Sequence, residues 1–271
     1  MLRAVQTENE RTIRLSDGEL TTLRQWGDAG PLLVGVHGLG ASRYGWARIG
    51  ERLAEHFRVV AYDQRGHGDS AEVRDMRFRR SVDDCAEVVA SLGEPVRAIL
   101  GHSWGGAVVI AAGRRAPVNR VVAIDPLLVA APGVWSQSVL PEYRSTLTKS
   151  REQRERDIRL DNAALPEIEI EAKLHAARRL TIDPIEALGA ENGIDAGRWN
   201  FRSLLDDYPR PLMLAVADVK RTVFGRLDRE YAREHGGPNV HLHEYEGASH
   251  SLQRDAFDRF MPDLQAFLSS P

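Results

Sequence analysis

The chain is poor in two chemically informative residues, cysteine and lysine. Cys85 is the single cysteine among 271 residues, so no internal disulfide can form. It lies in the helix-like run SVDDCAEVVASLG, where a small buried apolar residue is expected rather than a reactive thiol. The three lysines are Lys149, Lys173 and Lys220, which leaves arginine to carry most of the positive charge.

The chain also lacks a strong charge imbalance and a long apolar run. Its formal net charge of -3 provides no general attraction to phosphate, so we expect no nucleic-acid partner. No stretch approaches the roughly 20 apolar residues that cross a bilayer, and the N-terminal MLRAVQTENERTIRL has no signal-peptide core. We therefore expect a cytoplasmic protein without a membrane span.

Metal and cofactor signatures are missing as well. No pair of histidines or cysteines has metal-ligand spacing on a common element, so we expect no metal and no cofactor. A small-molecule substrate is the expected partner, and the sequence leaves the oligomeric state open.

Strand-like and helix-like segments alternate along the chain. The segment RTIRLSDGELTTLRQW predicts an antiparallel hairpin around Asp17-Gly18, a dipeptide that favours tight turns. Further strands are predicted by the apolar runs at 32–37, 57–63, 96–101, 120–125, 211–218 and 240–247. Helices are predicted at 43–55, 81–92, 104–115 and 255–268. This alternation indicates an α/β fold with a mainly parallel sheet.

The alternation breaks once, between the predicted strands at 120–125 and 211–218. Residues 132–208 hold charged, helix-like pieces and no convincing strand. We expect a helical cap at 132–208, inserted into a core formed by 1–131 and 209–271. Such an insertion would lie over the carboxyl ends of the sheet, where ligands bind in open α/β folds. A surface excursion without a role is the alternative.

The segment Gly101-His102-Ser103-Trp104-Gly105 predicts a reactive serine. A buried strand ends just before it and a small-residue helix follows, so the chain must reverse at Ser103. Glycines two positions before and after allow the close approach of strand and helix in such a turn. A serine hydroxyl needs a neighbouring base, and histidine has the best-matched pKa.

His250 is the histidine best placed to serve as that base. It lies in YEGASHSLQRD, in the loop between the last predicted strand and the terminal helix, at the same rim of the sheet as Ser103. His102 flanks the serine, but adjacent residues at a sharp turn point in different directions. A structural loop histidine is the alternative role for His250.

At this point the sequence resembles the α/β-hydrolase family over nearly its whole length, in the serine esterase or lactonase-like branch. Four motifs carry the resemblance: HGLG at 37–40, DQRGHGDS at 63–70, GHSWGG at 101–106 and GASH at 247–250. The resemblance implies a mostly parallel eight-stranded sheet flanked by helices, with the cap after the sixth strand. It also implies that Ser103 is the nucleophile, His250 the general base and acid, and the Leu39 and Trp104 N–H groups the oxyanion hole. The DQRGHGDS segment is mostly structural in the family.

The third triad member departs from the common family pattern. Most relatives carry the acid after the seventh strand. Here that position holds Lys220, which cannot accept a hydrogen bond from the imidazole. Asp125 follows the sixth strand, which some branches use for the acid, and it is our first choice. Asp218 is the alternative.

The resulting expectation is a serine hydrolase that cleaves a carboxylic ester or lactone through an acyl-enzyme. The HSWGG string also resembles the elbow of epoxide hydrolases and dehalogenases, which carry aspartate where this chain has Ser103; serine favours acyl transfer. Two alternatives stay open. The same site could run a lyase, carbon–carbon hydrolase or cofactor-free perhydrolase reaction, or the fold could be a weakly active ligand-binding receptor.

Overall fold

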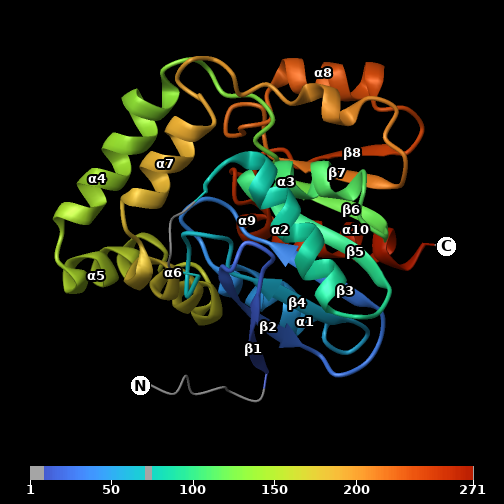
Figure 1. The fold of residues 1–271 in the computed structure, drawn as a ribbon, viewed down its shortest axis with the longest axis horizontal. Helices are drawn as coiled ribbons and strands as arrows, with labels where there is room; N and C mark the ends of the chain where they lie inside the picture. Colours follow the sequence, from blue (N-terminus) through green and yellow to red (C-terminus); the bar gives the residue numbers. More distant parts are fainter. Residues whose placement is uncertain (1–8, 71–74, 271) are drawn as a thin grey trace.

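A computed structural model describes residues 9–70 and 75–270 of the chain (Figure 1). The remaining positions, 1–8, 71–74 and 271, belong to the segments assigned above to the core and lie outside the described residues. In the described parts of the chain, every helix is too short or too polar to span a bilayer.

One eight-stranded sheet runs through the molecule in the order β1-β2-β4-β3-β5-β6-β7-β8. The strands are β1 Glu10–Arg14, β2 Leu20–Trp26, β3 Leu32–Val36, β4 Arg58–Tyr62, β5 Val96–His102, β6 Val118–Ile124, β7 Leu212–Val216 and β8 Val240–Glu244. The β1–β2 and β2–β4 pairs are antiparallel, and β3 to β8 are parallel. The predicted α/β fold and the N-terminal hairpin are therefore confirmed.

The parallel strands are apolar because both faces of the sheet are covered. Consecutive residues of β6, such as Val121 and Val122, are fully buried and fall into two separate apolar clusters, one on each face of the sheet. One cluster includes residues of α2 (Phe78–Ser91), α3 (Trp104–Gly113) and α8 (Arg226–His235). The other includes residues of α1 (Ala47–Leu53), α9 (Leu252–Asp255) and α10 (Phe257–Ser269). A strand with two dry faces reads as a continuous apolar run.

The C-terminal helix differs from its prediction. The sequence predicts one helix over 255–268, whereas the chain forms α9, leaves helical geometry at Ala256 (φ -112°, ψ 25°) and continues as α10. The short α9 is therefore a separate helix, and it directly follows the loop that carries His250.

Helices without strands fill the connection from β6 to β7, as Figure 1 shows at the side of the sheet. They are η2 Trp135–Val139, α4 Leu140–Thr148, α5 Arg151–Asp161, α6 Glu167–Arg179, α7 Asp183–Glu191 and η3 Arg202–Leu205. We call α4 to α7 the insertion helices. Residues 132–208 are all described, and their one β contact is the isolated bridge between Val129 and Asn200.

The connection is tied to the sheet domain by aromatic and ionic contacts. The Trp199 ring stacks on Trp104 with centroids 4.5 Å apart, and Arg179 of α6 forms an ion pair with Asp69. His175 of α6 contacts the Ser42 hydroxyl through Nδ1 at 3.1 Å. These contacts hold α6 and the Trp199 segment against the carboxyl edge of the sheet.

Candidate active site

Ser103 lies on a strained turn between β5 and α3. Its φ of 56° and ψ of -117° belong to a region that residues with a side chain rarely occupy. The flanking glycines are required by space, because a Cβ on Gly101 would lie 2.1 Å from the Gly105 carbonyl oxygen, and one on Gly105 would lie 2.3 Å from the Val36 oxygen. The spacing of the GHSWG segment therefore has a steric cause.

The HGLG loop after β3 packs against the same turn. A Cβ on Gly38 would lie 3.1 Å from the Ser103 Cβ, so the two loops nearly touch. His37 fixes the start of the loop: its Nδ1–H donates to the Gly38 oxygen at 2.7 Å, and its Nε2 accepts from the Gln64 N–H at 3.0 Å. Burial, with a smaller contribution from His67, lowers the pKa of His37 to about 3, so this imidazole is neutral.

Leu39 and Trp104 each present a backbone N–H at this edge. Among the described residues, neither N–H donates to a backbone acceptor. Trp104 is the first residue of α3, where the aligned peptide dipoles favour negative charge. Both residues border the cavity that contains the Ser103 side chain.

His250 and Asp125 form a hydrogen-bonded pair. The His250 Nδ1–H donates to Asp125 Oδ2 at 2.6 Å, and the Asp125 residue is fully buried. The other bonds to this carboxylate come from the N–H groups of Ala217 (3.0 Å) and Val223 (3.1 Å) and from the Thr222 hydroxyl. Burial raises the pKa of Asp125, but the hydrogen bond from His250, followed by those from Thr222 and Ala217, outweighs it, so the pKa lies below its ordinary value.

Asp218 follows β7 at the same edge, and in the described part of the chain no hydrogen bond or ion pair joins it to His250. Its oxygens accept from the Lys220 and Gly247 N–H groups, each at 2.9 Å, and its own N–H donates to the Ala248 oxygen at 3.1 Å. These backbone hydrogen bonds lower the pKa of Asp218. Asp218 therefore braces the loop that leads to His250.

Sequence reasoning missed the contact of His102 with His250. The His102 Nε2–H donates to the His250 backbone oxygen at 2.9 Å, and the two rings lie 4.7 Å apart. Burial, followed by the proximity of His250, lowers the pKa of His102 to about 3. A neutral His102 therefore holds the His250 backbone, a role that its position beside Ser103 did not reveal.

Ser103 and His250 border one cavity of about 790 Å³. Neither residue hydrogen-bonds the other through its side chain within the described part of the chain. Catalytic hydrogen bonds are often long before substrate binds, so this geometry is compatible with a nucleophile and its base. The cavity continues between the insertion helices, which contribute side chains from α4, α5 and α6.

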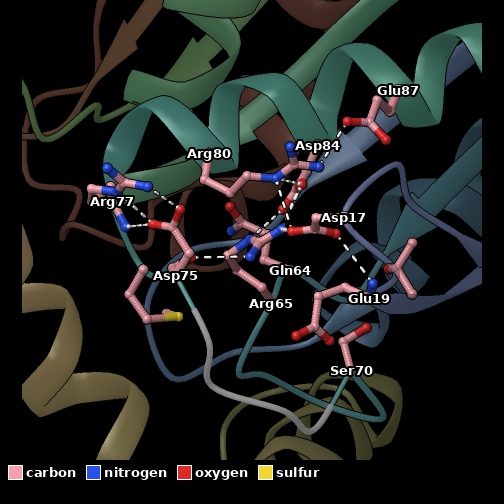
Figure 2. A network of polar contacts seen from close by, with 12 residues as sticks. Asp17, Glu19, Gln64, Arg65, Ser70, Asp75, Arg77, Arg80, Asp84 and Glu87 are labelled. Carbon is pink, nitrogen blue, oxygen red and sulfur yellow. Dashed lines mark hydrogen bonds and ion pairs between the residues drawn. The ribbon is translucent and has the colours of Figure 1, made fainter.

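Arg65 of the DQRGHGDS segment belongs to an ion-pair network (Figure 2), and the residues of this network are not among those that border the cavity. Arg65 lies at the centre of the network and bonds both oxygens of Asp84, at 2.6 and 2.8 Å, and Asp17 at 2.9 Å. It also donates to the Asp75 carbonyl at 3.0 Å. These bonds fasten the loop after β4 to the β1–β2 turn and to α2, which agrees with the structural role that the family resemblance implies.

No group of three or more His, Cys, Asp or Glu side chains gathers as a metal site within residues 9–70 and 75–270. The arrangement at the sheet edge consists instead of a strained serine, an imidazole held by a buried carboxylate, and two N–H groups. These groups can carry out proton transfer and nucleophilic attack.

Comparison with known proteins agrees with this fold. The sequence model of the alpha/beta hydrolase family matches residues 33–262. The chain belongs to this family.

Individual relatives match the chain over parts of their lengths. The bifunctional esterase/perhydrolase of Acinetobacter calcoaceticus is 35% identical over 159 residues, which are 54% of this chain and 57% of that protein. The magnesium-chelatase 30 kDa subunit of Rhodobacter capsulatus is 35% identical over 107 residues, 39% of this chain and 38% of that protein. The crystal structure of E-2-(acetamidomethylene)succinate hydrolase superposes with a TM-score of 0.76 at 17% identity, covering 96% of this chain and 99% of that one.

Proposed function

We propose that this α/β-hydrolase is a serine hydrolase that cleaves a carboxylic ester or lactone through an acyl-enzyme intermediate. The observation that carries the proposal is the 2.6 Å hydrogen bond from His250 Nδ1 to the buried Asp125, in the loop cluster that also presents Ser103 to the cavity. Asp125 is the proposed acid of the triad in preference to Asp218, which contacts backbone groups instead.

The proposed reaction begins with attack of Ser103 Oγ on the substrate carbonyl carbon. His250 Nε2 takes the hydroxyl proton, and Asp125 stabilises the imidazolium that forms. The Leu39 and Trp104 N–H groups donate to the oxyanion, a contribution of roughly 3 kcal/mol for each donor. His250 then protonates the leaving alkoxide, and a water molecule, deprotonated by the same imidazole, releases the acid from Ser103.

The insertion helices are proposed to act as the cap of the site, with residues 132–208 as its boundaries. The supporting observation is that α4, α5 and α6 border the same cavity as Ser103. Tyr143 of α4 reaches the oxyanion loop itself, because its hydroxyl lies 3.3 Å from the Leu39 carbonyl oxygen and donates to it. The acyl or alcohol group of the substrate would lie among these side chains.

Fluorophosphonate labelling and burst kinetics test the proposal together. The wild-type protein should be labelled at Ser103 and should release para-nitrophenol from para-nitrophenyl acetate in a burst. Ser103→Ala should abolish both. Ser251→Ala is the matched control, because it removes another hydroxyl bordering the cavity, and it should retain labelling. A Ser103→Ala protein with full turnover would exclude the mechanism, and an unlabelled wild type would favour a ligand-binding protein.

A cofactor-free perhydrolase reaction is the second candidate. It is favoured by the similarity to the bifunctional esterase/perhydrolase, which covers 54% of this chain. In that reaction hydrogen peroxide, rather than water, attacks the same acyl-enzyme and releases a peracid. Product analysis in the presence of acetate and peroxide separates the two, because a strict esterase forms no peracid.

A further inference from the structure

Two cationic side chains border the cavity that contains Ser103. Lys173 comes from α6, among the insertion helices, and Arg254 comes from α9, four residues after His250. Among the described residues that border this cavity, Glu142 is the one acidic residue, and it is exposed on α4. The cavity therefore brings two positive charges from separate elements together.

Glu169 is the one carboxylate that interacts with both of these cations within the described part of the chain. Arg254 Nε donates to Glu169 Oε2 at 2.9 Å, and both of these side chains are largely buried. Lys173 is one helical turn from Glu169 and forms no ion pair or hydrogen bond with any described residue. Lys149, by contrast, donates to Asp157 at 2.7 Å on the outer surface of the insertion helices.

The surroundings of Lys173 disfavour the charged form of its side chain. Partial burial, followed by the charge of Arg254 and opposed by Glu169, lowers the pKa of Lys173 to about 8. A lysine in this environment keeps its charge most readily when an anion approaches. The Arg254 guanidinium also has N–H groups beyond the Nε that Glu169 occupies.

We propose that Lys173 and Arg254 bind a carboxylate carried by the substrate, so that the preferred substrates are esters or lactones with a second, free carboxylate. This proposal rests on the proposed serine hydrolase function, which it narrows to one substrate class. The alternative is that the aliphatic part of the Lys173 side chain only packs along the cavity wall. In that case the enzyme would show no preference between charged and neutral acyl chains.

A pair of para-nitrophenyl esters of equal length tests the substrate class. The adipate monoester ends in a carboxylate, and the hexanoate ends in a methyl group. Lys173→Gln should lower kcat/KM for the adipate monoester by about tenfold or more and change the hexanoate value less than about twofold. Lys173→Arg should keep the preference. Lys149→Gln, which removes the same charge outside the cavity, should leave both values unchanged.

The pH dependence gives a second readout. Lys173 is charged below pH 8 and loses its charge above it, so the wild-type preference for the adipate monoester should fall as pH rises through about 8. The preference of Lys173→Gln should show no such step. Equal losses on both esters, or a wild type that prefers the hexanoate at pH 7, would overturn the proposal.

Binding of free adipate to Ser103→Ala separates this proposal from the proposed function. Titration calorimetry should detect adipate binding that is lost in the Ser103→Ala, Lys173→Gln double variant. If adipate binds in this manner but neither ester is cleaved by the wild type, the anion site stands and the hydrolase proposal fails. If both esters are cleaved equally and adipate does not bind, the hydrolase proposal stands and the anion site fails.

Discussion

Replacing Asp125 by asparagine should lower turnover far more than it lowers stability. The carboxylate accepts from His250 Nδ1 and Val223 N–H through Oδ2, and from Ala217 N–H and Thr222 through Oδ1. Asparagine keeps one accepting oxygen, and its NH₂ group cannot accept a hydrogen bond. With the oxygen on the Ala217 side, the amide nitrogen faces His250 and forces its Nδ1 to act as an acceptor.

The magnitude follows from the tautomer that this change imposes. An imidazole that accepts at Nδ1 carries its proton on Nε2, so it cannot take the Ser103 proton. In well-studied triads this error costs about ten-thousand-fold in kcat. The lost hydrogen bonds to a charged acceptor should cost roughly 2–3 kcal/mol of unfolding free energy. A domain whose free energy of unfolding is about 5–15 kcal/mol remains folded after such a loss.

The assay compares Asp125→Asn with Asp218→Asn on para-nitrophenyl acetate, with urea unfolding of each variant. Asp218 contacts backbone N–H groups and not His250, so its variant should lose less than about tenfold in kcat. Equal and small losses for the two variants would refute the assignment of either aspartate as the orienting acid. A large loss in Asp218→Asn alone would transfer the role to that residue.

Further predictions concern stability and its pH dependence. Gly105→Ala should lower the unfolding free energy by roughly 3 kcal/mol or more, because its Cβ would lie 2.3 Å from a β3 carbonyl oxygen. Gly45→Ala, whose nearest neighbour would be 3.7 Å away, should change the urea midpoint little. Arg65→Met removes the main partner of the buried Asp84 carboxylate on α2, so it should lower the unfolding free energy by about 3 kcal/mol. Arg77→Ala removes an exposed ion pair and should leave the urea midpoint almost unchanged. Because the pKa of Asp125 is lowered, its carboxylate stabilises the fold above its unfolded pKa of about 4, and this contribution is lost as pH falls through the folded pKa. The acid limb of unfolding free energy against pH should therefore be shallower in Asp125→Asn, and an identical limb would contradict this account.

The strands and the strained turn at Ser103 were predictable because their causes are local. A strand covered on both faces must be apolar throughout, as β5 and β6 are, and the Ser103 turn needs glycines at fixed offsets. The position of His250 after the last strand followed from the rule that parallel strands end at one edge.

The choice between Asp125 and Asp218 depends on tertiary geometry. Both residues follow strands at the same edge, and what separates them is the direction of each carboxylate after its strand. Asp125 has a φ of 41°, which no local pattern around it requires. Lys173 looks like an ordinary helical lysine in the sequence, because its proximity to Arg254 depends on how α6 lies against α9.

Helix α6 joins two traits that protein engineers usually treat separately. Lys173 borders the cavity, while Arg179 and His175 of the same helix contact Asp69 and Ser42 of the sheet domain. In the proposed hydrolase, random mutagenesis across this helix would change substrate selectivity and the contacts of α6 with the sheet domain at the same time. In the proposed hydrolase, a library that varies only the positions bordering the cavity, with Arg179 kept, would change acyl preference without removing the contacts that hold α6 to the sheet domain.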